Sequence, residues 1–158
     1  MRRLPIILLS LLAMACSSID CPVNNIVSTQ YVICDKDGAE MKLSDTLSIL
    51  TRRMDDTITV LNRLVQKATF SLQISNSHPE DELFFVFYKG PVYTIDTVWI
   101  KKDDYPHFES VDCNAAFFHT LTGVRYTTHY IDSIVIKNTS VNYDVSTVHF
   151  HLYPKVSN

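Results

Sequence analysis

The clearest pattern along the chain is a strict alternation of apolar and polar residues from position 68 to position 74. The apolar members are Ala68, Phe70, Leu72 and Ile74, and the residues between them are Thr69, Ser71 and Gln73. Side chains of a β-strand point alternately to opposite faces of the sheet. This segment therefore predicts a strand with one buried face and one exposed face.

Other segments are rich in β-branched and aromatic residues and are bounded by turn residues, which favours further strands. These segments are 27–34, a region that begins at Leu47, 58–64, 92–101, 131–136 and 148–152. Residues 83–88 are apolar on both faces, which predicts a central strand covered on both sides. Residues 115–121 are the only candidate for one or two helical turns. Together, the segments predict an all-β fold, an antiparallel β-sandwich, immunoglobulin-like or similar, with at most one short helix.

The N-terminal residues have the pattern of an export signal. Arg2 and Arg3 are followed by the apolar stretch 5–14, which is too short to span a bilayer. Ala15, a small residue, then precedes Cys16. The order of these features resembles a bacterial lipobox, in which the cysteine receives a lipid and becomes the first residue of the mature chain.

Ala13 departs from the commonest lipobox, which has Leu at this position, and plain secretion is the alternative to lipidation at Cys16. We expect a lipoprotein signal peptide at 1–15, a lipid-anchored tether at 16–25 and a single β-sandwich domain at 26–158. No other stretch is long and apolar enough to cross a membrane.

The charge pattern refines this location. The chain has a net charge of −3, and no run of Lys or Arg follows the signal peptide, so nucleic acid is excluded as a partner class. Only Asp20 is acidic within 17–21, whereas lipoproteins exported to the surface commonly carry several acidic residues there. We expect a lipid anchor in the outer membrane, with the domain on the periplasmic face.

Three cysteines remain besides Cys16, namely Cys21, Cys34 and Cys113. In an oxidising compartment two of them can pair, and the sequence permits three pairings. We favour Cys21 with Cys113, because this bridge fastens the N-terminal segment to the domain and closes a long loop. The alternative is three reduced, mostly buried thiols.

Several short segments together resemble a known family. They are Cys-Ser-Ser-Ile-Asp-Cys-Pro at 16–22, Phe-Glu-Ser-Val-Asp-Cys at 108–113, Phe117-Phe118, Thr128-His129 and Ile-Asp-Ser-Ile-Val-Ile at 131–136. This set is similar to small Bacteroidota lipoproteins that carry a domain of unknown function numbered 6452. The resemblance implies an envelope location and a mostly β fold, and it provides no reaction, cofactor or functional residue.

The histidines form the main candidate for metal chemistry. His149 and His151 are two residues apart, so a strand would place both imidazoles on one face. With His129 or His119 as a third ligand they would suit Zn²⁺ or Cu²⁺, and a metal-binding protein or metal-dependent enzyme is our alternative function. No carboxylate or cysteine lies at a supporting spacing, so we expect no metal and imidazoles that face solvent or a partner.

A short triplet, Asp followed by Ser or Thr and an apolar residue, occurs four times. Its candidate hydroxyl residues are Thr46, Thr57, Thr97 and Ser133. The triplet is similar to the acceptor sequence for O-glycosylation of Bacteroidota envelope proteins. A turn residue followed by the start of a strand generates the same triplet without a sugar.

Motifs of nucleophilic catalysis, phosphate loops and dinucleotide fingerprints are absent from the sequence. The adjacent carboxylates Glu80-Asp81 and Asp103-Asp104 are interpreted as solvated loop ends. We therefore expect a protein without enzymatic activity or a cofactor. Its expected function is that of a binding or structural module for another envelope protein or a glycan, since aromatic residues suit such contacts.

Overall fold

The computed structural model describes residue 21 and residues 26–155, and its secondary structure there consists of strands. The strands are β1 (Ser28–Ile33), β2 (Thr46–Arg53), β3 (Asp56–Leu64), β4 (Thr69–Gln73), β5 (Glu80–Lys89), β6 (Val92–His107), β7 (Ala116–Tyr126), β8 (Ile131–Ile136), β9 (Ser140–Val141) and β10 (Phe150–Pro154). This confirms the predicted all-β class. Across these described residues we find no helix that could span a bilayer.

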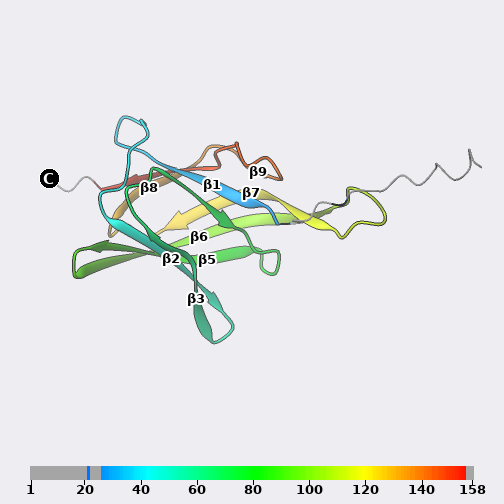
Figure 1. The fold of residues 1–158 in the computed structure, drawn as a ribbon, viewed down its shortest axis with the longest axis horizontal. Helices are drawn as coiled ribbons and strands as arrows, with labels where there is room; N and C mark the ends of the chain where they lie inside the picture. Colours follow the sequence, from blue (N-terminus) through cyan, green and yellow to red (C-terminus); the bar gives the residue numbers. More distant parts are fainter. Residues whose placement is uncertain (1–20, 22–25, 156–158) are drawn as a thin grey trace, which may run out of the picture.

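The strands form two sheets that pack face to face as a β-sandwich (Figure 1). The smaller sheet has the order β4-β1-β10-β8, and the larger has the order β3-β2-β5-β6-β7-β9. Neighbouring strands are antiparallel except β1 and β10, which are parallel. The chain crosses from the larger to the smaller sheet between β7 and β8, and this crossing helps to form the candidate site.

Aromatic rings occupy the centre of the core. The ring of Tyr31 stacks between those of Phe70 and Phe150, with centroids 4.6 Å and 4.8 Å away. Phe85 from the larger sheet meets the edge of this stack, 6.4 Å from Tyr31. Each such buried ring contributes about 1.5–3 kcal/mol from burial. Phe70 belongs to the alternating segment, whose predicted inward face is confirmed by its position in the core.

The helical interpretation of residues 115–121 is wrong, because residues 116–121 belong to β7. Phe118 is opposite Tyr105 and His119 is opposite Asp104 in the ladder with β6. Aromatic and β-branched residues favour a half-buried pleated surface. The long edge of β6 provides the backbone hydrogen-bond partners that favour a strand over a helix here.

Strand β5 is central, as predicted, with β2 and β6 on either side. Its Phe85 and Phe87 face the core, whereas Phe84 on the opposite face remains partly exposed. The guanidinium of Arg52, from the neighbouring strand, lies 5.8 Å from the centroid of the Phe84 ring. The outer face of β5 therefore receives cover from side chains of its own sheet, not from a further layer.

A disulfide joins Cys21 to Cys113, the pairing favoured from the sequence, while Cys34 is free and buried. The two bonded residues are 92 positions apart, and their Cα atoms are separated by 5.5 Å. Closing a loop of this length stabilises a fold by about 4–5 kcal/mol in the chain-entropy account. The bridge fixes the N-terminal segment to the connection between β6 and β7.

Candidate ligand-binding groove

A groove of about 880 Å³ lies at one end of the sandwich, where several connections meet. Leu43 reaches it from the β1–β2 connection, Phe87 and Val92 from β5 and β6, and Tyr130 from the β7–β8 turn. Lys155, just after β10, completes the rim. Concave surfaces with an apolar floor and a few polar groups are the usual form of ligand sites.

Tyr130 forms the aromatic floor together with Phe87. The two rings stack with centroids 3.9 Å apart and planes inclined by 11°. The Tyr130 hydroxyl donates a hydrogen bond to Asp45 Oδ2 at 2.8 Å. Burial and the neighbouring Asp45 carboxylate raise the pKa of Tyr130 well above its usual value. The ring is therefore a fixed, neutral hydrogen-bond donor and not an acid or base near neutral pH.

A buried carboxylate holds the turn that presents Tyr130. Asp96 Oδ2 accepts the backbone N–H groups of Tyr130 and Ile131 at 2.7 Å and 2.8 Å. Asp96 Oδ1 accepts the backbone N–H of His129 and the hydroxyl of Thr127, each at 2.7 Å. Burial by itself raises the pKa of Asp96, but these hydrogen bonds outweigh it and lower the pKa. Asp96 is thus an ionised anchor beneath the groove.

His129 lies at the rim, above this anchor. Its side chain is 66% exposed, and Nδ1 is 3.0 Å from Asp96 Oδ1. Lys89 and Lys155 are also exposed on the rim. The groove therefore combines a rigid aromatic floor with hydrogen-bonding and cationic groups around its edge, which suits the binding of a ligand with both apolar and polar parts.

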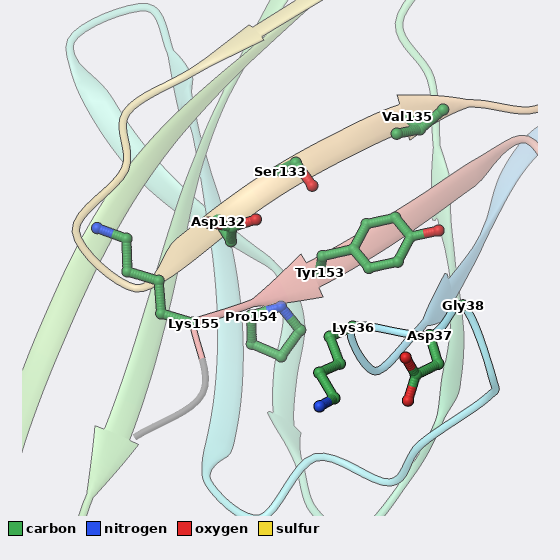
Figure 2. Close-up of a pocket in the computed structure, with 9 residues that line it drawn as sticks. All are labelled: Lys36, Asp37, Gly38, Asp132, Ser133, Val135, Tyr153, Pro154 and Lys155. Carbon is green, nitrogen blue, oxygen red and sulfur yellow. The ribbon is translucent and has the colours of Figure 1, made fainter. Parts of the chain in front are cut away.

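A second hollow of about 780 Å³ adjoins the groove across Pro154 and Lys155. Figure 2 shows its lining, which comes from the β1–β2 turn, from β8 and from β10. The turn includes Gly38, whose φ of 84° is a positive value that glycine adopts without strain. Asp35 Oδ1 accepts the backbone N–H groups of Asp37 and Ala39, each at 2.9 Å. This is the hydrogen bonding of a tight turn, and it gives the hollow a defined wall.

The histidines of the metal hypothesis have separate roles. His149 is buried, contrary to the expectation that it faces solvent or a partner. Its Nδ1 accepts the backbone N–H of Gln30, and its Nε2 donates to the carbonyl of Ser140, both at 3.0 Å. His151 is only partly buried, with Nδ1 3.5 Å from the Tyr153 hydroxyl. Among the residues that the structure describes, no group of three or more His, Cys, Asp or Glu is placed to hold a metal ion.

The four glycosylation triplets differ in exposure. Thr57 is exposed near the tip of the β2–β3 hairpin, whereas Thr46, Thr97 and Ser133 are partly buried within strands. In the third triplet, Asp96 is the anchor beneath the groove. Accessibility favours Thr57 as the acceptor, and the use of any of these triplets stays a prediction.

A buried ionic cluster around Lys102 connects β5, β6 and the loop before β5. It was not predicted from the sequence. The Lys102 ammonium is fully buried, 3.6 Å from Asp81 Oδ2 and 3.7 Å from Asp104 Oδ1, and it donates to the His78 carbonyl. Asp104 Oδ1 is also 2.6 Å from His119 Nδ1. Burial raises the pKa of Asp81. The interpretation as solvated loop ends is wrong for Asp81 and Asp104, because they lie in β5 and β6 and face a buried cation, whereas Asp103 is exposed as expected.

Comparison with known proteins supports the domain of unknown function noted from the sequence. Residues 46–154 match the model of a family described as "Family of unknown function (DUF6452)". No curated protein and no solved structure matches the chain. The family description specifies neither a reaction nor a ligand.

The buried His149 predicts a loss of stability in mild acid. Burial lowers the pKa of its imidazole, and burial also lowers that of His151. Below pH 6.5 the unfolded chain therefore binds protons that the native protein does not. The free energy of unfolding should fall as the pH drops from about 6.5, by about 1.4 kcal/mol for each pH unit between the folded and unfolded pKa values of each group.

Urea unfolding at pH 7.5 and pH 5.5 measures this loss. The His149→Gln variant is the matched control, because an amide can donate to Ser140 and accept from Gln30 but does not titrate. The variant should lose less stability between the two pH values than the wild type. An equal loss in both proteins would assign the pH dependence to other groups.

The second prediction concerns the anchor of the groove. Asp96→Asn replaces an acceptor oxygen by an NH₂ group that faces backbone N–H donors, so it should lower the free energy of unfolding by about 3 kcal/mol. Asp132→Asn is the matched control, because Asp132 is exposed and begins another of the four triplets. That control should change stability by no more than about 0.5 kcal/mol. Similar values for the two variants in thermal or urea unfolding would contradict the anchoring role.

Proposed function

This chain belongs to the family of unknown function DUF6452, and we propose that it is a non-catalytic binding module held at a bacterial outer membrane by a lipid. In this proposal, Cys16 carries the lipid and the domain lies on the periplasmic face. The ligand is part of another envelope protein or a glycan. The quoted segments also favour a place among the small lipoproteins of Bacteroidota.

The N-terminal pattern and the disulfide support the location. Cys16 follows a short apolar stretch and a small residue, as in an exported lipoprotein. A disulfide between Cys21 and Cys113 is typical of an oxidising compartment such as the periplasm. Cys34, the remaining thiol, is buried and has a pKa raised by burial, as expected of an inert structural cysteine.

The groove is the observation that carries the proposed binding function. It lies at the end of the long axis opposite the connection of β6 and β7, and hence opposite the disulfide (Figure 1). A lipid attached near Cys21 would leave the groove facing away from the membrane. Its rim contains Val92, 66% exposed, beside the cationic Lys89. Exposed apolar and cationic groups around an aromatic floor suit a partner surface or a glycan.

The polar groups beneath the groove support a binding function over catalysis. Asp96 is saturated by donors from the β7–β8 turn, and Asp45 accepts the Tyr130 hydroxyl. Catalytic acids and bases need a pKa near the working pH and access to the reacting atom. The low pKa of Asp96 and the raised pKa of Tyr130 are suited to a fixed surface.

The lipid anchor is tested by Cys16→Ser in the native host. The wild type should partition into the detergent phase, because each buried methylene of an acyl chain contributes about 0.8 kcal/mol. The variant should appear as an unprocessed or soluble form. Equal partitioning of the two proteins would contradict lipidation at Cys16.

The groove is tested by a photo-crosslinking amino acid at Val92, with Val145 as the matched control. Val145 is 72% exposed and lies in the connection between β9 and β10, so it is at least as accessible as Val92. Irradiation of cells should yield a discrete conjugate from position 92 and not from position 145. Isolated envelopes should give the same conjugate. No conjugate from position 92, or an identical set from both positions, would contradict binding in the groove.

A further inference from the structure

We propose that the tip of the β6–β7 hairpin, residues 108–115, rests in the headgroup layer of the membrane and fixes the orientation of the domain. This inference deepens the proposed function and rests on lipidation at Cys16. Its partner is a zwitterionic lipid surface. The tip would make the domain a two-point membrane protein, held by the lipid and by its own side chains.

The tip exposes large apolar side chains. Val111 is 97% exposed and Phe108 is 60% exposed, and Tyr105 and Phe117 on the adjoining strands are also exposed. Single exposed apolar residues are ordinary, but a group of them at one protruding end marks an interaction surface. Aromatic side chains are favoured at the boundary between lipid and water, where one part of the ring system is buried and the rest is wet.

The disulfide places this tip near the anchor. Cys113 is two residues beyond Val111 and is bonded to Cys21. Cys21 follows Cys16 by five residues, a span of at most about 18 Å for a fully extended chain. The lipidated cysteine and the tip are therefore held within a short reach of each other, and the intervening sequence is too short for the domain to withdraw its tip far from the surface.

The shape of the molecule directs the tip towards the membrane. The β6–β7 hairpin extends to one end of the long axis, and the groove lies at the other end (Figure 1). β6 is the longest strand, with 16 residues, and its last part pairs only with β7 on one side and with no strand of the smaller sheet. The tip can therefore meet a flat surface without obstruction from the rest of the sandwich.

The charges at the tip decide the kind of surface. Glu109 and Asp112 are exposed on either side of Val111, and Glu109 Oε1 lies 3.0 Å from His107 Nε2. Anionic headgroups would repel this tip, whereas phosphatidylethanolamine presents an ammonium group to each carboxylate. Two acidic residues beside two apolar ones also favour shallow contact in the headgroup layer over deep insertion.

The test uses tryptophan fluorescence of the lipidated full chain in phosphatidylethanolamine and phosphatidylcholine vesicles that contain lipids brominated near the glycerol backbone. Val111→Trp is the probe. Val92→Trp is its matched control, because both replace an exposed valine and position 92 lies at the groove. Trp99, the only native tryptophan, is present in the parent and in both variants and provides the background.

The brominated lipids should quench the Val111→Trp signal several times more strongly than the Val92→Trp signal, and adding phosphatidylglycerol should weaken this quenching. Mass spectrometry of each sample first establishes the lipid on Cys16 and the Cys21–Cys113 bridge. A chain without lipid would overturn the proposed function itself. A lipidated chain in which both positions are quenched equally weakly would overturn the inference and leave the anchor intact. The fluorescence of the Val111→Trp variant is also measured in detergent without lipid. If the Trp at position 111 becomes more buried there as the protein concentration rises, the tip contacts a second copy and the inference is overturned.

Discussion

The Asp96 carboxylate is the interaction on which the groove end of this sandwich depends. The chain leaves the larger sheet at the end of β7 and enters the smaller sheet at β8, so the turn between them must hold the two layers in a fixed relation. Consecutive N–H groups of that turn point at one buried anion on β6. These hydrogen bonds fix the backbone at Tyr130, whose ring stacks on Phe87 and whose hydroxyl donates to Asp45.

Two aspartates show how the same residue type has opposite properties in one core. Asp96 receives backbone N–H groups and a hydroxyl at short distances, and its pKa is lowered. Asp81 is largely buried, with a side chain that is 12% exposed, a cation 3.6 Å away and a single backbone donor, the N–H of Ser75, at 3.2 Å, and its pKa is raised. Directed hydrogen bonds repay the loss of hydration for Asp96, whereas the longer ion pair with Lys102 does so only partly for Asp81. Asp96 therefore fixes the conformation of the β7–β8 turn. The burial of ionised Asp81 is instead destabilising, as its raised pKa indicates.

Sequence patterns predicted the strands whose identity depends on local periodicity, such as the segment around Phe70 and Leu72, and the β-sandwich that follows from them. They failed where the outcome depends on a distant partner. Residues 116–121 become a strand because β6 provides an edge. The buried Asp96 accepts hydrogen bonds from donors 31 to 35 residues further along the chain, which no local pattern indicates. The groove combines four separate stretches of chain, and no local pattern indicates which connections meet at one end of a sandwich. His149 resembled a solvent-facing strand residue, yet its ring completes hydrogen bonds between two distant backbone segments.

The Cys21–Cys113 bridge also determines how mechanical force would enter the domain. In a protein held by its N-terminus, tension would ordinarily be applied to the first strand, and β1 would be sheared away from β4 and β10. Here the disulfide adds a second covalent route from Cys21, so a pull on the chain before Cys21 also reaches the β6–β7 hairpin and runs along its long axis. Strand β1 shares that tension with the hairpin as long as the bridge is oxidised. Reduction would leave β1 to carry the whole force, which would make the mechanical strength of the domain sensitive to the redox state of its compartment.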